Sequence, residues 1–291
     1  MRFQTLIAAA LALACSAFVA PAHADDAQPA TTASESEAEL SAEFTDPLTT
    51  LPQIFLKDDY TPDSYGTHAN TNRLTARVIV PRVPESSLLP LVQLIRPTLQ
   101  VVTAPTGVRS QTRTSLGDLP IFDLAVLPWP DRKKTGLLMG VGPLFVFPTA
   151  THREAGQGSW QAGPAFAAIY KGIPGLLIGT LIQNPISFAE VARDRKPVDT
   201  LLVQPIVLAY LGKGFYVKSA DATWSRGWNQ GQSTLLPISF GIGHVTVHEG
   251  WPPINVFAGG EYMAWRDDAP VAPQWTARVG VTVAFPEWKP W

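Results

Sequence analysis

Trp275–Phe285, WTARVGVTVAF, alternates between two kinds of side chain. Successive side chains of a β-strand point to opposite faces, so a period of two predicts a strand. Eleven residues at about 3.3 Å each, tilted by about 40°, span a little over 25 Å, the height of the apolar band of an outer-membrane barrel. The apolar set also places an aromatic residue at each end of the segment. The segment therefore predicts a membrane-crossing strand, with Arg278 on its polar face.

The same period recurs along most of the chain after Arg73. Clean alternation covers residues 74–80, 122–126, 137–147, 160–170, 236–242 and 254–262, and looser strand-like patterns cover 90–102, 173–186, 200–211 and 214–224. An open sheet edge in lipid would leave backbone groups unsatisfied, and single-chain bacterial barrels have even strand numbers. We therefore predict an all-β fold: a closed antiparallel transmembrane β-barrel of about 10–12 strands over residues 72–291.

Composition agrees with a membrane barrel. Charged residues make up 16% of the chain, against about 25% in a typical soluble domain, and nine tryptophans are present. No segment after the N-terminal 24 residues approaches the roughly 18 consecutive apolar residues of a membrane helix. A soluble β-sandwich or lipocalin-like barrel also alternates, but its polar face should carry many charges, whereas these faces carry mostly Gly, Ala, Ser and Thr.

Residues 1–24 have the features of a secretory signal peptide. Arg2 precedes an apolar run, and Ala22-His23-Ala24 forms an A-x-A cleavage pattern. The alternative, lipidation of Cys15, is disfavoured because Ala12 stands where a large aliphatic residue is expected. Cleavage after Ala24 removes Arg2 and the single cysteine, which leaves 21 Lys+Arg against 24 Asp+Glu, a net charge of −3. Neither a disulfide nor a nucleic-acid-binding surface is expected.

Two segments precede the predicted barrel. Residues 25–43 are rich in Ala, Thr, Ser, Glu and Pro and predict a disordered tail. Residues 44–71 form a lead-in or plug segment, in which Leu48–Leu56 shows helical spacing after a Thr/Asp cap with Pro in the first turn. A short amphipathic helix plugging the lumen and an extended periplasmic lead-in are both open at this point.

Three prolines conflict with a regular sheet because each removes a ladder donor. Pro143 and Pro164 each follow a glycine, so Gly142-Pro143 and Gly163-Pro164 predict bulges or contacts with an inserted plug. Pro205 is the third.

Catalytic and metal-binding patterns are scarce. His244 and His248 are four residues apart, which on a strand separates them by about 13 Å, too far for one metal ion. No G-x-S-x-G, P-loop or dinucleotide motif occurs. We expect no cofactor, no metal and no enzymatic activity, with a barrel enzyme acting on lipids as the remaining catalytic alternative.

The informative residues of a barrel are charges at lumen-facing positions, because a charge facing lipid costs about 2–4 kcal/mol at the midplane. Alternation assigns the apolar set that includes Phe122, Leu124 and Val126 to the lipid face. The charges out of phase with the apolar sets are the lumen-facing candidates: Arg73, Arg77, Asp123, Lys171, Glu261 and Arg278. Pairing of Arg278 with Glu261 across the lumen is favoured over substrate binding.

Several phrases, taken in order, resemble a known family. They are Asn184–Ala189, Gln204-Pro205, Pro237–Gly243, Pro252–Val256 and the pattern from Trp275 to Pro286. This looks like the bacterial outer-membrane barrel family of the phenol meta-pathway "MetA" type, often labelled transporter or "neuromedin U". The resemblance implies a barrel for uptake of aromatic or other apolar compounds and carries over no site residue.

The sequence thus predicts an outer-membrane channel or facilitator of a Gram-negative bacterium, passing small apolar or aromatic molecules by passive diffusion. Its expected partners are the lipid bilayer, the barrel-assembly machinery and a small-molecule solute, with no nucleic acid. Either Phe285 or Trp291 serves as the terminal assembly signal. A plugged structural or ligand-binding barrel without transport is the alternative.

Overall fold

The computed structural model describes residues 43–286 except 50, 83–91, 107, 109–110, 128–135, 192–194, 220, 230–232 and 249. The predicted signal peptide, nearly all of the predicted tail and Trp291 lie outside the described residues. The long strands of the wall are β1 (Gln53–Thr61), β3 (Thr71–Arg82), β4 (Val92–Pro105), β6 (Leu119–Leu127), β7 (Leu137–Phe147), β8 (Ser159–Ile173), β9 (Leu176–Gln183), β11 (Thr200–Gly212), β14 (Thr234–Thr246), β15 (Ile254–Asp267) and β17 (Trp275–Ala284).

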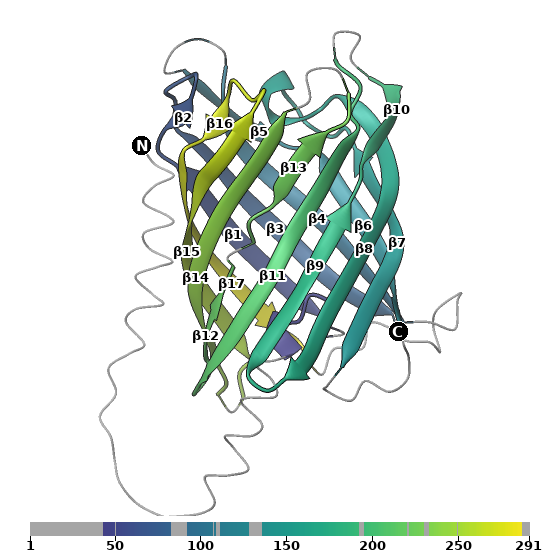
Figure 1. Cartoon of the computed structure of the whole chain (residues 1–291), viewed down its shortest axis with the longest axis vertical. Helices are drawn as coiled ribbons and strands as arrows, with labels where there is room; N and C mark the ends of the chain where they lie inside the picture. Colours follow the sequence, from purple (N-terminus) through teal and green to yellow (C-terminus); the bar gives the residue numbers. More distant parts are fainter. Residues whose placement is uncertain are drawn as a thin grey trace, which may run out of the picture. The chain divides into compact units, whose positions relative to one another are not determined.

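Two short strands, β12 (Phe215–Lys218) and β13 (Trp224–Gly227), share the remaining position between β11 and β14. Four smaller strands and a 3-10 turn at Arg153–Ala155 lie at one end of the wall. The strands are β2 (Ser64–Tyr65), β5 (Thr112–Leu116), β10 (Ile186–Glu190) and β16 (Ala272–Pro273). The described residues thus form a closed antiparallel barrel of twelve wall positions, as the alternation predicts (Figure 1).

The barrel closes where its first and last strands meet. β1 pairs with β17 from Gln53↔Ala284 to Tyr60↔Ala277, and on its other side pairs with β3. β1 therefore begins and β17 ends at the same end of the barrel, here called the terminal end; the opposite end is called the loop end. Two connections at the terminal end are tight turns whose glycines, Gly175 and Gly214, have positive φ.

The predicted boundary of the barrel is wrong at its N-terminal side. Gln53–Thr61 is a wall strand, whereas the sequence places it in a lead-in or plug, with a helix over Leu48–Leu56 as one alternative. Among the described residues from 43 to 71, helix occurs only at residues 43–45. Ile54 and Leu56 are each 44% exposed on the outer face. The strand is hard to recognise because Asp58 also faces outward, where Asn72 donates a 2.7 Å hydrogen bond to it.

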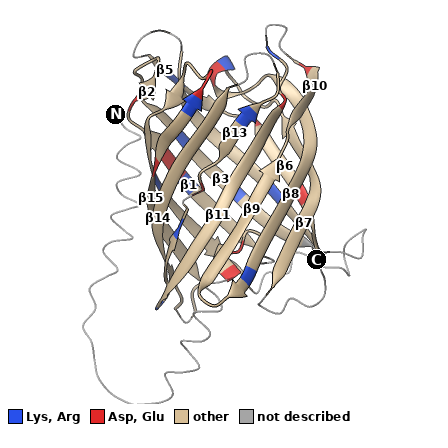
Figure 2. Ribbon diagram, in the orientation of Figure 1, with Lys and Arg blue, Asp and Glu red and all other residues tan. Residues whose placement is uncertain are grey.

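The outer face is apolar, as an outer-membrane barrel requires. On β14 the outward residues include Ile238, 60% exposed, and Phe240, 63% exposed, and the strands in Figure 2 run for long stretches without a charge. Exposed aromatic residues lie near both ends, as in an interfacial aromatic belt. They include Trp160, Trp265 and Trp275 toward the loop end, and Tyr170 and Phe215 toward the terminal end.

One strand is reversed relative to the prediction. Phe122, Leu124 and Val126 face the interior and are 5%, 1% and 4% exposed, so Asp123 shares the outer face of β6. The alternation was ambiguous because Ile121, Ala125 and Leu127 supply a second apolar face. The interior accepts apolar side chains here because they pack into one hydrophobic core with Phe44 and Leu48.

An N-terminal segment fills the interior at the terminal end. Phe44, Leu48 and Leu51 are buried and belong to one core with inward side chains of the wall, among them Leu94, Leu124 and Ile169. A side-chain carbon at Gly140 would come within 2.9 Å of Leu48, so the wall accommodates this leucine by lacking one. Residues 43–49, here called the inner segment, thus occupy the terminal end of the lumen.

Within the described residues, no helix is both long and apolar enough to cross a membrane.

The wall prolines lie where the ladder is already incomplete. Pro143 and Pro164 face each other across β7 and β8 without the predicted bulge, so neither needs to donate to the other. At Pro205 the neighbouring strand is interrupted between β12 and β13. There the Ser219 hydroxyl replaces ladder bonds, since it donates to the Pro205 carbonyl at 2.9 Å and accepts from the Val207 amide at 3.2 Å.

A charge placed on the outer face tests this orientation. Phe240→Arg, near the middle of β14, is expected to lower the free energy of unfolding by about 2–4 kcal/mol, because the guanidinium would face hydrocarbon. Leu236→Arg, on the same face nearer the rim, is expected to cost about 0–1 kcal/mol, and Phe240→Leu controls for loss of the ring. Denaturant unfolding from phospholipid vesicles measures all three, and equal costs for both arginines would contradict the assigned face.

Candidate functional site: the charged lumen

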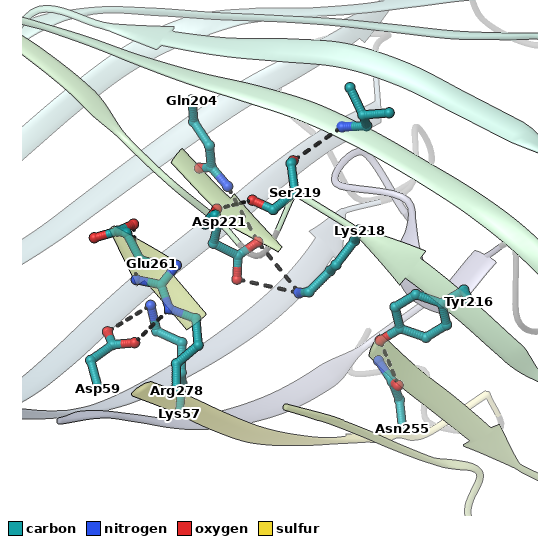
Figure 3. A network of polar contacts seen from close by, with 12 residues as sticks. Lys57, Asp59, Gln204, Tyr216, Lys218, Ser219, Asp221, Asn255, Glu261 and Arg278 are labelled. Carbon is teal, nitrogen blue, oxygen red and sulfur yellow. Dashed lines mark hydrogen bonds and ion pairs between the residues drawn. The ribbon is translucent and has the colours of Figure 1, made fainter. Parts of the chain in front are cut away.

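A chain of ion pairs crosses the closing seam of the barrel. Arg278 is 5% exposed and lies directly opposite Asp59 in the β1–β17 ladder. Its Nε donates to Asp59 Oδ1 at 3.0 Å, and its Nη2 donates to Glu261 Oε2 at 3.2 Å. Lys57 Nζ lies 2.8 Å from the other oxygen of Asp59. Figure 3 shows these four side chains meeting inside the wall, and the predicted Arg278–Glu261 pair is among them.

A second cluster forms where β12 is interrupted. Asp221 has a φ of +59°, a left-handed conformation that an aspartate adopts more readily than most residues. Lys218 Nζ lies 3.4 Å from both of its oxygens, and Gln204 Nε2 donates to Oδ1 at 3.4 Å (Figure 3). The break in the strand therefore places a carboxylate inside the lumen.

Aromatic rings support three of the cations. Phe55 and Phe257 stack with centroids 6.0 Å apart. Lys218 Nζ lies 3.7 Å from the Phe257 centroid, and Arg77 Cζ lies 5.1 Å from the Phe55 centroid. Arg96 Cζ lies 3.8 Å from the Phe122 centroid. Ring faces attract cations, so these contacts fix the positions of long side chains that would otherwise be mobile.

The inner segment is anchored by polar contacts as well as by its apolar side chains. Lys171 near the end of β8 forms an ion pair with Asp46, whose carboxylate also accepts from the Leu48 amide at 2.9 Å. The hydroxyls of Thr45 and Tyr210 lie 2.7 Å apart. The segment is therefore bound to β8 and β11, two wall strands that lie on either side of β9.

A cavity of about 110 Å³ lies in the lumen beside the inner segment. This volume is several times what one water molecule needs. Its polar lining includes Gln53, Arg77, Arg96, Lys218 and Asp221, and its apolar lining includes Phe44, Phe55, Ile79, Leu181, Ile206 and Phe257. The site combines positive charge with an apolar surface.

The predicted lumen residues fall into three groups. Arg73, Arg77, Glu261 and Arg278 occupy inward positions of the barrel ladders, and Lys171 points to the inner segment. Asp123 is on the outer face, contrary to the prediction, and its Oδ2 lies 3.5 Å from Gln93 Nε2. The sequence prediction missed Lys57, Asp59, Arg96, Lys218 and Asp221.

The histidine pair is separate from the lumen charges. The rings of His244 and Phe215 lie with centroids 4.2 Å apart and planes tilted by 53°, and His244 Nδ1 lies 3.0 Å from the Thr246 hydroxyl. In the part of the chain that the structure describes, no three His, Cys, Asp or Glu side chains are placed to hold a metal ion together.

A solved outer-membrane channel has a similar barrel fold. The COG4313 outer membrane channel from Pseudomonas putida F1 aligns with a TM-score of 0.57 at 9% identity, covering 89% of this chain and all of that one. The NanC porin aligns with a TM-score of 0.49 at 11% identity, covering 80% of this chain and 98% of that one. At 9% identity, the alignment with the COG4313 channel shows a shared barrel fold and nothing more.

No family model matches the sequence, and a search of curated proteins finds no match either. The "MetA" type therefore stays a prediction.

The seam ion pairs give a stability prediction. Arg278→Met would leave Asp59 and Glu261 close together without their shared cation, and the loss of one partner from a buried ion pair costs about 3–5 kcal/mol. We expect a loss of this order in vesicle-based unfolding. Adding Glu261→Gln to Arg278→Met should recover part of it, whereas an additive effect of the two substitutions would contradict the pairing.

Proposed function

We propose that the protein is a channel in the outer membrane of a Gram-negative bacterium. It would be exported by a signal peptide that is cleaved after Ala24. The observation that carries the proposal is a closed barrel with an apolar exterior and a lumen lined by charged and polar groups. A purely structural anchor would have no need of Lys57, Asp59, Lys218 and Asp221 inside the wall, because charges are costly to bury. Passive diffusion requires no cofactor.

The transported solutes are proposed to be small and to have an apolar or aromatic part. The cavity of about 110 Å³ suits a small solute, and Phe55 and Phe257 supply ring faces along it. The apolar outer face and the aromatic residues near both ends of the barrel support contact with a bilayer. The final strand, which ends near Phe285, is proposed as the signal that the barrel-assembly machinery recognises.

A plugged barrel is the second candidate function. It is favoured by the inner segment, whose buried Phe44 and Leu48 fill the terminal end of the lumen. In the channel proposal this segment narrows the passage; in the plugged barrel it closes it. The two candidates differ in flux through the intact protein.

Flux through the full-length mature protein tests the channel. Reconstituted protein should produce ion conductance in planar bilayers and liposome swelling whose rate falls steeply from glycine to sucrose, because the narrow lumen excludes larger solutes. Liposomes containing heat-denatured protein provide the control. Absence of both ion and solute flux would rule out an open channel and favour the plugged barrel.

Release of the inner segment tests its restrictive role. Asp46→Asn combined with Lys171→Met removes the ion pair without leaving an unpaired charge, and should raise conductance severalfold. Removing residues 43–49 should raise it further, since β1 begins only at Gln53. Lys213→Met, in the turn between β11 and β12, removes the same positive charge away from the segment and should leave conductance unchanged. Equal conductance in all variants would exclude a restrictive segment.

A further inference from the structure

Two side chains that line the lumen cavity each carry a buried hydrogen-bond donor with no acceptor among the described residues. Arg96 is 9% exposed and Gln53 is 3% exposed. Among the described residues, neither Arg96 Nε nor Gln53 Nε2 has a hydrogen-bond partner. Both side chains line the same cavity. Because an unsatisfied buried donor costs about 1–3 kcal/mol, two of them at one cavity indicate a place for an acceptor.

The strand register brings these donors to one level of the barrel. Gln53 of β1 pairs with Ile79 of β3, and the adjacent Val80 pairs with Ile95 of β4. Arg96 follows Ile95 and faces inward, as does Gln53. The two side chains therefore lie on either side of Ile79, on the two strands that pair with β3, and both point into the same part of the lumen.

The charge at this level is positive. Arg77 also lines the cavity, and its Nε donates to the Thr98 hydroxyl at 3.4 Å. Among the described residues, neither Arg77 nor Arg96 has a carboxylate within 4.0 Å. The other charges of the lining are paired, Lys218 with Asp221 and Asp46 with Lys171. Two guanidinium groups thus remain for an anion.

The geometry of the arginines favours a planar anion. Each guanidinium lies against a ring: Arg96 Cζ is 3.8 Å from the Phe122 centroid and Arg77 Cζ is 5.1 Å from the Phe55 centroid. The edge of a guanidinium matches the two oxygens of a carboxylate. Beside these groups the lining is apolar, with Phe44, Ile79, Leu181 and Ile206.

We propose that this cavity is a binding site for small monocarboxylates with an apolar body, in which Arg96, Arg77 and Gln53 hold the carboxylate. The proposal rests on the proposed function, because it names the solute class that the channel would bind. The carboxylate would replace the missing acceptor, and the apolar body would lie against the rings and aliphatic side chains of the lining.

Calorimetric titration of the purified full-length mature protein, in detergent and low-chloride buffer, tests the site with benzoate as probe. Benzoate should bind saturably and at least tenfold more tightly than benzyl alcohol, which keeps the ring without the charge. Benzoate should also bind more tightly than acetate, which keeps the charge but has little apolar body. No saturable benzoate binding, equal binding of benzyl alcohol, or equal displacement by chloride would overturn the proposal.

Matched variants locate the site. Arg96→Gln should weaken benzoate binding at least tenfold, and Gln53→Leu should weaken it severalfold. Arg73→Gln removes the same charge from an inward position of β3, four residues from Arg77, and should change binding less than twofold. The heat-dependent gel shift of folded barrels shows which variants have folded. An equal effect of Arg73→Gln and Arg96→Gln, or no effect of Gln53→Leu in a folded protein, would overturn the assignment.

The binding and flux experiments distinguish failure of the carboxylate site from failure of the channel. A protein that conducts ions but does not bind benzoate contradicts only the carboxylate site. A protein that binds benzoate but passes neither ions nor solutes contradicts the channel and leaves a ligand-binding barrel.

Discussion

The pairing of β1 with β17 is the constraint on which the rest of the structure depends. Unpaired backbone groups in a bilayer cost several kcal/mol each, so a barrel is stable there only when its first and last strands meet. The same ladder sets Asp59 opposite Arg278, and Glu261 on β15 reaches the same guanidinium. Closure of the wall and placement of the seam charges are therefore one event: a one-residue slip of β1 would turn Asp59 and Lys57 toward lipid.

The polar groups of the lumen are satisfied in different ways at different levels along the barrel axis. Toward the loop end, at the level of Asp59 and Arg278, charges neutralise one another, since Arg278 pairs with two carboxylates. At the terminal end, the inner segment supplies Phe44 and Leu48 and makes the interior resemble a soluble core. Between these regions lies the cavity, where Arg96 Nε and Gln53 Nε2 are buried without an acceptor among the described residues. A ligand-binding function is best sought at this intermediate level.

The sequence predicts the fold well because a membrane wall enforces a strict period of two on its outer face. It predicts the orientation of β17, and with it Arg278, because small and polar residues fill the inward positions. It fails where both faces are apolar: β6 and β4 pack against the inner segment, so neither the reversed Asp123 nor the inward Arg96 could be recognised from alternation. It fails again at β1, where Asp58 faces outward beside inward Lys57 and Asp59 and hides the strand.

The missed charges explain why alternation locates a wall better than a site. Asp221 enters the lumen only because β12 is interrupted opposite Pro205, and the interruption is stabilised by Ser219 rather than by a regular ladder. Such a break depends on residues of two strands that are remote in sequence. The proline conflict was visible in the sequence, but its consequence, an acid turned inward next to Lys218, requires the register of the neighbouring strand. Lumen chemistry in this barrel is thus set by departures from the pattern that defines its fold.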